Sequence, residues 1–228
     1  MPDHSSIYKN QVEMYDLMIS KQPKLGKVIE EIICYEGLDI IELGAGTGRI
    51  TTELATRAKS IVALDSSKEM LEITESKLKQ KNLSNWKTLV ADHRALPLEN
   101  NSADLVISGW SICYLTSSNH VEWHDHLEQI ISELKRVLRP GGTILLFETM
   151  GTGFSTPTPP SFLLHYFEAL EKEFHFSHKW IRTDYSFDHL GQAEELTKFF
   201  FGEELASRVV KENLVSLPEC AGIWWLKL

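Results

Sequence analysis

The sequence predicts an α/β fold: a doubly wound, seven-stranded and mostly parallel sheet with one antiparallel edge strand and helices on both faces. Strand-like and helix-like segments alternate through the middle of the chain, which is typical of βαβ units. The runs LVI (105–107) and ILLF (144–147) are apolar without interruption, as in strands that helices cover on both sides. Glycines at 44, 46 and 48 directly follow the first strand, where the chain turns into a helix.

Apolar residues at strand and helix spacing define the elements in order along the chain. Strands are expected at 38–43, 60–64, 87–90, 104–108 and 143–147, and helices at 49–58, 67–80 and 120–137. Two further helices precede them, at 5–20 and at 24–35, with Pro23 between them. We expect residues 1–36 to form a helical lid on a domain that comprises residues 37–228.

The character of the chain changes after Glu148. Residues 150–160, MGTGFSTPTPP, are rich in Gly, Ser, Thr and Pro and predict a loop. An aromatic helix (162–174), a strand (179–187), a helical region (192–212) and a closing strand (222–228) follow. The two late strands fit an antiparallel edge of the sheet. We expect an aromatic insertion at about 151–178 to form a cap over a ligand pocket.

Composition limits the class of protein and its partners. The chain has 228 residues, of which 43% are hydrophobic and 24% charged, with a formal net charge of −9. An acidic chain repels phosphate backbones, which makes nucleic acid an unfavourable partner. Its three cysteines form no CxxC pair, and no apolar run approaches the roughly 20 residues of a membrane span. We therefore expect a cytoplasmic monomer or homodimer without a metal site or a membrane partner.

A glycine-rich turn carries the main indication of chemistry. In IIELGAGTGRIT (40–51) the glycines let the backbone approach a ligand closely, and the following helix offers free N–H groups. Asp65 ends the second strand 19 residues after Gly46, where a carboxylate can accept both hydroxyls of a ribose. Asp92 ends the third strand, and Pro-Gly-Gly precedes the fifth. Taken alone, the glycine pattern also suits a nicotinamide dinucleotide or a tight turn.

Together these segments resemble the class I S-adenosylmethionine-dependent methyltransferases. The matching residues are ELGAGTG, the ALD of 63–65, the D-x-x-ALP of 92–97 with Asp104 after it, and LRPGG. The chain is most similar to the small-molecule group that includes the ubiquinone and menaquinone biosynthesis methyltransferases. The resemblance implies a Rossmann-like methyltransferase fold, S-adenosylmethionine as cofactor, and methyl transfer to a small-molecule acceptor by in-line displacement. It covers about half of the chain and leaves the C-terminal third, and with it the acceptor, unassigned.

The resemblance also implies roles for individual residues. Gly44, Ala45 and Gly46, with Thr47 and Gly48 completing the turn, would line the methionine part of the cofactor, and Glu42 would orient its amino group. Asp65 would bind the ribose. The adenine would lie between Ser66 and Met70, with Asp92 and His93 at its amine edge. Gly109 and Trp110 would stand beside the transferring methyl group, and Tyr8 and Tyr15 would close over the cofactor.

Two residues are candidate general bases, needed only if the acceptor must lose a proton. Glu148 ends the fifth strand, where α/β proteins bind ligands, but a carboxylate that caps a loop fits this position equally well. His165 lies in the aromatic insertion. Two other functions stay open: a nicotinamide-dependent oxidoreductase, and a non-catalytic protein that binds the cofactor. The first is disfavoured because a pyrophosphate is repelled by a carboxylate such as Glu42 near the helix N-terminus.

Overall fold

The computed structural model describes residues 4–228, with the side chain of Ser5 outside the described part. Seven strands form one sheet in the order β3-β2-β1-β4-β5-β9-β6, and a short hairpin, β7-β8, stands apart. Strands β1 to β5 pair in parallel, as the sequence predicts. The strands of the sheet are β1 (Asp39–Leu43), β2 (Ser60–Asp65), β3 (Trp86–Val90), β4 (Ala103–Gly109), β5 (Leu138–Thr152), β6 (Ser177–Arg182) and β9 (Glu219–Lys227).

The single antiparallel strand is β9, and it does not lie at the edge of the sheet. It pairs antiparallel with β5 on one side and with β6 on the other. The prediction of one antiparallel strand is confirmed, but its expected place at the edge is wrong. Burial explains the difference: Ala221, Ile223 and Trp224 of β9 are fully buried, whereas Trp180 of the edge strand β6 is 45% exposed. A strand that is apolar on both faces belongs inside a sheet.

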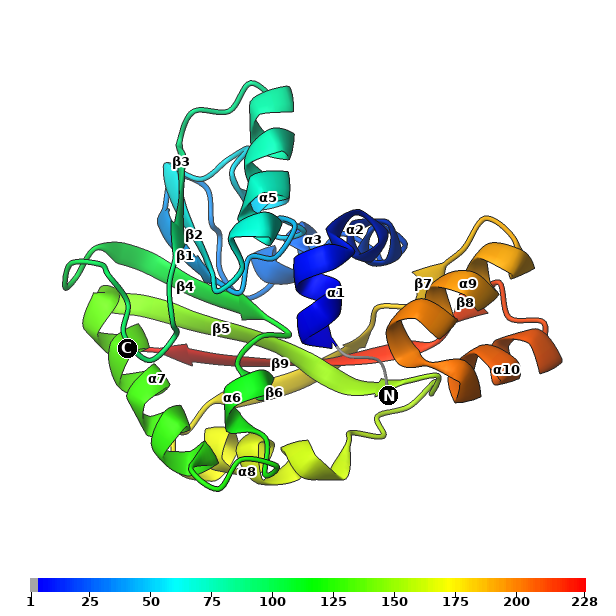
Figure 1. Cartoon of the computed structure of the whole chain (residues 1–228). Coiled ribbons are helices and arrows are strands. Elements are labelled where there is room, and N and C mark those ends of the chain that lie inside the picture. Colours follow the sequence, from blue (N-terminus) through cyan, green and yellow to red (C-terminus); the bar gives the residue numbers. More distant parts are fainter. Residues whose placement is uncertain (1–3) are drawn as a thin grey trace.

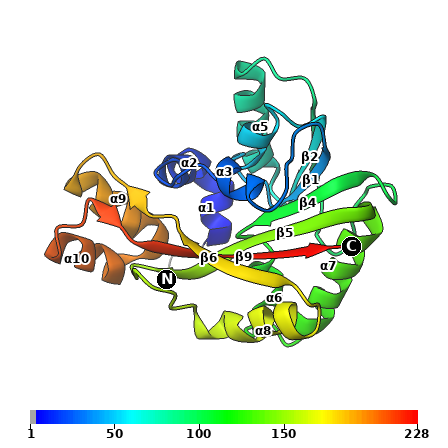
Figure 2. The same cartoon turned by 180° about the vertical axis from the view of Figure 1, so that it is seen from behind.

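Helices cover both faces of the sheet (Figures 1 and 2). Ile144 and Leu146 of β5 belong to a core that includes residues of α7 (Trp123–Val137) and α8 (Leu164–Lys172). Leu145 and Phe147 belong to a second core with α3 (Gly26–Glu30), α4 (Thr51–Leu54) and α5 (Lys68–Gln80). Successive residues of a strand point to opposite faces, so the apolar run of β5 fills both cores. This confirms the doubly wound arrangement.

A third core holds the N-terminal helices against the C-terminal part of the chain. Ile7, Met18 and Leu196 are among its buried residues. The expected helix at 5–20 is two helices, and the expected helical region at 192–212 is also two, because Gly202 adopts a positive φ of 96° between them. The elements of this core are α1 (His4–Asn10), α2 (Val12–Ser20), β7 (Tyr185–Ser186), α9 (Leu190–Phe201), α10 (Glu203–Lys211) and β8 (Ser216–Leu217). Figure 1 shows α9 and α10 beyond one end of the long strands β5 and β9, on the side where α1 and α2 lie.

The aromatic segment does not cap a pocket as expected. Helix α8 lies on one face of the sheet together with α7 (Figure 1). Its Tyr166 and Phe167 are buried, and the Phe167 ring stacks on Trp224 of β9 with centroids 4.5 Å apart. The aromatic residues of this helix thus supply core. Among residues 4–228, no helix is long and apolar enough to cross a membrane.

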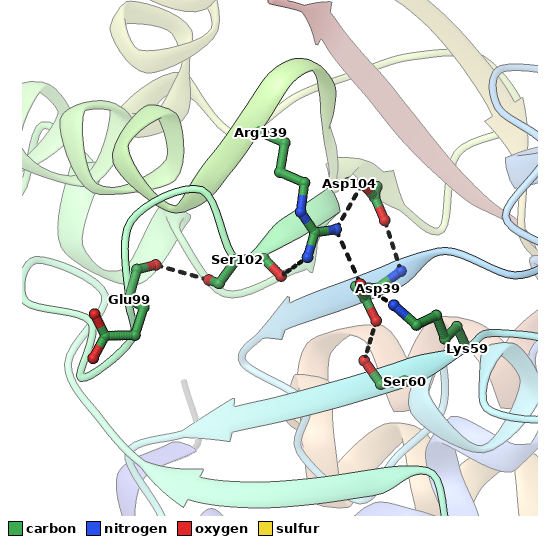
Figure 3. A network of polar contacts seen from close by, with 7 residues as sticks. All are labelled: Asp39, Lys59, Ser60, Glu99, Ser102, Asp104 and Arg139. Carbon is green, nitrogen blue, oxygen red and sulfur yellow. Dashed lines mark hydrogen bonds and ion pairs between the residues drawn. The ribbon is translucent and has the colours of Figure 1, made fainter.

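A polar network joins the amino-terminal ends of four strands (Figure 3). Asp39 begins β1 and accepts hydrogen bonds from Lys59 Nζ at 2.9 Å and Ser60 Oγ at 2.7 Å. Arg139 in β5 contacts Asp104 at 2.7 Å and Asp39 at 3.0 Å. These contacts fix the register of β1, β2, β4 and β5 at the end opposite to the glycine-rich turn.

Candidate functional site

Two adjoining cavities open at the carboxyl ends of β1, β2 and β4. The first, here the Asp65 cavity, also includes Ser66, Met70 and His93. The second, here the Arg49 cavity, extends past the glycine-rich turn to Tyr185 and Glu219. Seven residues line both cavities, so the two cavities share a wall and together form the cleft described here: His4, Tyr8, Tyr15, Gly44, Gly109, Trp110 and Tyr114.

Asp65 is held in a fixed orientation at the end of β2. Its Oδ2 accepts a hydrogen bond from Gly46 N and its Oδ1 one from Ser67 N, both at 2.8 Å. Burial raises the pKa of the carboxyl, and these backbone donors oppose the rise. The backbone of Ser66 also donates to this carboxylate, and since two carboxylate oxygens can accept about four hydrogen bonds, acceptor capacity remains for a ligand in the cavity.

The glycine-rich turn needs its glycines for different reasons. A Cβ on Gly44 would stand 2.0 Å from Ser111 Oγ, so the close approach of these two segments excludes a side chain. Gly46 has a φ of 54°, and a Cβ there would meet only Tyr15, at 3.9 Å, which leaves its cavity face open. A Cβ on Gly48 would stand 2.8 Å from Thr74 Oγ1, and this glycine lines neither cavity. Gly48 therefore shapes the turn without contacting a ligand.

Polar residues of the loop after β3 form another wall of the Asp65 cavity. Arg94 binds Asp92 through two nitrogens, at 2.6 and 2.9 Å, and this pairing lowers the pKa of Asp92 to about 2. His93 Nε2 shares a hydrogen bond of 2.7 Å with Ser111 Oγ. Burial disfavours the charged ring and lowers the pKa of His93 to about 4, so His93 is neutral at physiological pH.

Helix α1 covers the junction of the two cavities. Tyr8 and Tyr114 share a hydrogen bond of 2.6 Å between their hydroxyl groups. His4 Nε2 hydrogen-bonds to the carbonyl oxygen of Phe200 at 3.0 Å, which ties α1 to α9. The first helix of the expected lid thus closes over the cleft, while residues 1–3 of that lid lie outside the described residues.

The Arg49 cavity contains a partly buried guanidinium next to an aromatic ring. Arg49 lies 4.5 Å from the ring centroid of Trp110, within range of a cation–π interaction. Its two hydrogen bonds go to neutral oxygens, Gln22 Oε1 at 2.6 Å and Pro23 O at 3.3 Å, and its Nε has no partner. Trp110 itself has a φ of 52°, a conformation that is strained for a bulky residue and is retained at functional sites.

Two buried carboxyl groups also line the Arg49 cavity. Glu42 is 2% exposed and accepts a hydrogen bond from Thr51 Oγ1 at 2.5 Å, and its burial raises its pKa to about 8. Glu219 is 3% exposed and accepts a hydrogen bond from Thr149 Oγ1 at 3.0 Å. Burial raises the pKa of Glu219 to about 7. A cation that a ligand brings into the cavity would therefore favour the ionised form of both carboxyl groups.

In sequence, the chain matches known methyltransferases. The family model described as a methyltransferase domain matches residues 41–146, from the first strand to the fifth. Over 165 residues the chain is 32% identical to demethylmenaquinone methyltransferase from Lactococcus lactis subsp. lactis (strain IL1403), which covers 68% of this chain and 58% of that relative. The matched part of the chain belongs to the class I S-adenosylmethionine-dependent methyltransferases. It spans between 24% and 58% of the length of three curated relatives that it matches.

Solved structures share the fold of this chain. A SAM dependent methyltransferase from Aquifex aeolicus superposes with a TM-score of 0.56 at 15% identity, covering 99% of this chain and 94% of that one. The [4+2]-cyclase SpnF superposes with a TM-score of 0.57 at 20% identity, covering 89% and 79%. Since a cyclase has the same architecture, the fold alone does not establish methyl transfer.

The structure brings the predicted cofactor residues of this chain together. All of them except Gly48 line one of the two cavities. The two predicted bases do not. Glu148 lies beneath the Arg49 cavity, where its Oε1 accepts hydrogen bonds from Cys113 N at 3.1 Å and Tyr166 Oη at 3.2 Å. His165 is exposed on α8, and its ring stacks on Trp123 with centroids 6.2 Å apart. We therefore withdraw His165 and Glu148 as direct proton acceptors.

Several residues of the cleft were not predicted. Arg49 directly follows the glycine-rich turn, and its position was a signal that could have been used. Glu219, Tyr185 and Phe200 come from the C-terminal third, where no motif marks them. Glu219 reaches the cavity because β9 runs antiparallel inside the sheet, so its first residue stands at the edge where the parallel strands end, whereas Tyr185 and Phe200 come from β7 and α9.

Proposed function

We propose that this chain transfers a methyl group from S-adenosylmethionine to a small-molecule acceptor bound in the Arg49 cavity. The observation that carries the proposal is that the two cavities adjoin and share seven lining residues. The Asp65 cavity has the glycine-rich turn and the carboxylate that suit an aminoacyl nucleoside, and it joins a second, aromatic cavity under the same helix. Two ligands can thus meet at the shared wall formed by Gly109, Trp110 and Tyr114.

The residues present fit this cofactor. The remaining acceptor capacity of Asp65 suits a ribose hydroxyl, and Met70 and Ser66 offer a partly apolar wall for the adenine. The open face of Gly46 leaves room for the backbone to approach the ligand. Glu42 is placed to bind the amino group of the methionine part. We assign Arg49 to its carboxylate, because the guanidinium stands between the turn and Trp110 with an unpartnered Nε.

The protein contributes alignment and exclusion of water. The bound cofactor supplies a methyl group that is already activated by a sulfonium, so the residues of the cleft need only hold the acceptor in line with it. Helix α1, with Tyr8 and His4, covers the junction where the transfer would take place. The aromatic rings of the Arg49 cavity keep that junction apolar, which favours a reaction in which charge is lost from sulfur.

Titration with S-adenosylhomocysteine tests the cofactor part of the proposal. We expect micromolar binding by the wild-type chain, and binding weakened about 10- to 100-fold by Asp65→Ala, because charge-assisted hydrogen bonds contribute roughly 1.5–3 kcal/mol. NADH serves as the control ligand. Binding of NADH without S-adenosylhomocysteine would favour an oxidoreductase, and unchanged affinity of Asp65→Ala would contradict the ribose assignment.

A screen with labelled S-adenosylmethionine tests the transfer itself. Radiolabel that moves to a small molecule supports methyl transfer. Cofactor binding with no transfer to any of a broad set of amines, phenols, thiols and acids would favour a protein that binds the cofactor without transferring its methyl group. The [4+2]-cyclase SpnF has the same fold, and this is the observation that favours the second candidate function.

A further inference from the structure

We propose that the acceptor carries a basic nitrogen and that Glu219 binds it. This inference rests on the proposed function and adds the chemical class of the acceptor. It concerns the end of the Arg49 cavity that lies outside the Asp65 cavity and is built by the C-terminal third of the chain. Nothing in the sequence resemblance covers that part.

Glu219 is fixed in place from several sides. It is the first residue of β9, and its backbone N donates a hydrogen bond to Asp184 Oδ1 at 3.1 Å. Its Oε1 accepts a hydrogen bond from Thr149 Oγ1 of β5 at 3.0 Å. Its Oε2 is buried and has no hydrogen-bond partner, although the side chain lines the cavity. The carboxyl group is therefore oriented with one oxygen left unpaired.

An unpaired buried carboxylate is costly, and a ligand cation would remove the cost. An unsatisfied buried polar group costs about 1–3 kcal/mol, and more when it is charged. Three titratable or charged residues approach Glu219 from other parts of the chain, namely Arg49, Asp184 and Tyr185, and Cys220 follows it in β9. Arg49 favours the carboxylate, Asp184 opposes it, and burial dominates, which leaves the pKa of Glu219 at about 7. A protonated amine beside Oε2 would shift this balance toward the charged form.

Aromatic rings around this end of the cavity also favour a cation. Phe200 and Phe201 have ring centroids 5.1 Å apart, and Tyr185 lies 5.7 Å from Phe201. All three line the cavity with Glu219. The negative faces of aromatic rings attract ammonium groups, by about 0.5–2 kcal/mol each when water is excluded. A carboxylate among aromatic rings is thus suited to an amine.

The buried carboxyl of Glu219 argues against an anionic acceptor at this end of the cavity. Arg49 lines the same cavity, and its guanidinium is held by Gln22 and Pro23 and lies over Trp110. Its charge favours the carboxylate form of Glu219. An anion beside Glu219 would meet a buried carboxyl of like charge, which is strongly unfavourable in an apolar site.

Three probes of similar shape test the proposal: 2-phenylethylamine, 2-phenylethanol and 3-phenylpropanoate. Their binding is measured by calorimetry to the chain saturated with S-adenosylhomocysteine. We expect the amine to bind at least about tenfold tighter than the other two, as for a paired buried charge. Amine binding should strengthen from about pH 6 to about pH 8, because Glu219 loses its proton while the amine keeps its own.

Glu219→Gln should reduce amine affinity by about tenfold or more and leave alcohol affinity within about twofold. The glutamine can still accept from Thr149, which turns its NH₂ group toward the place of the amine. Glu194→Gln, the same change at an exposed position of α9, is the matched control and should alter neither. Unchanged S-adenosylhomocysteine affinity and an undiminished melting temperature confirm that Glu219→Gln folds.

Several outcomes would overturn the inference. The inference is wrong if the amine binds no better than the alcohol, or if 3-phenylpropanoate binds best of the three. It is also wrong if Glu219→Gln leaves the amine affinity unchanged. Failure of the proposed function is recognised separately. In that case the wild-type chain does not bind S-adenosylhomocysteine at all, before any probe is added.

Discussion

Replacing Glu42 by glutamine should stabilise the ligand-free protein at alkaline pH and weaken its binding of S-adenosylhomocysteine. Glu42 is 2% exposed, and burial raises its pKa from 4.5 to about 8. The folded carboxyl therefore holds its proton more tightly than the unfolded one. The free energy of unfolding must then fall as pH rises between about 4.5 and about 8, because folding requires uptake of a proton in that range.

The magnitude follows from the size of this displacement. One pKa unit corresponds to about 1.4 kcal/mol, so the full displacement corresponds to about 5 kcal/mol. Relaxation and water entry reduce such penalties in real proteins, and we expect Glu42→Gln to gain about 2–4 kcal/mol at about pH 8. Near pH 5 the wild-type carboxyl is protonated in the fold and resembles the glutamine, so the two proteins should have about equal stability there. Glutamine can keep the hydrogen bond from Thr51.

Urea unfolding followed by tryptophan fluorescence at about pH 5 and about pH 8 measures the stability change. Calorimetry with S-adenosylhomocysteine measures the binding change, which we expect to be about 10- to 100-fold for the loss of a charge-assisted hydrogen bond. Glu194→Gln is the control for both. Equal stability of variant and wild type at about pH 8 would refute the argument from burial, and unchanged affinity would remove Glu42 from the cofactor site.

Two further substitutions separate the site from the scaffold. Gly44→Ala should cost about 2–4 kcal/mol and abolish S-adenosylhomocysteine binding, because its Cβ would stand 2.0 Å from Ser111 Oγ at a φ of 66°. Gly37→Ala is the control, because Gly37 has a φ of 74° but a Cβ there would meet nothing within 4 Å, and it should cost only about 1 kcal/mol in urea unfolding. Equal losses of unfolding free energy in the two variants would show that contact with Ser111 is unimportant. Arg139→Gln should lower the free energy of unfolding only slightly, because water screens the ion pairs of a side chain that is 38% exposed, and it should leave cofactor affinity unchanged. A clear loss of affinity would show that the network in Figure 3 influences the cleft.

Local patterns made much of the fold and the cofactor half of the site predictable. Residues of the glycine-rich turn and Asp65 are close in sequence to the strands that position them, and the parallel order of those strands follows from βαβ connections. Asp65 and Gly46 accordingly lie within 2.8 Å of one another, side chain to backbone. The order of the last strands is different. Whether β9 pairs at the edge or between β5 and β6 depends on contacts between segments far apart in the chain.

The errors have one physical source: apolar and aromatic patterns indicate burial but not what covers a residue. The aromatic helix α8 was expected over a pocket, and it instead packs on the sheet, with Tyr166 fully buried. His165, on the same helix, consequently faces outward. Glu219 carried no signal at all, because a single glutamate next to an apolar strand is common on protein surfaces. Only the pairing of β9 shows that this one is buried.

The interior place of β9 bears on how proteins of this architecture can diversify. Every residue that lines the Asp65 cavity lies between 4 and 115 among the described residues, whereas those from 149 onward line only the Arg49 cavity. Substitutions or recombination in the C-terminal half can therefore change which acceptor is bound, while the residues that bind the nucleoside stay the same. Because β9 lies inside the sheet beside β5, the residues at its start have a fixed position. A new specificity therefore does not require a new loop structure.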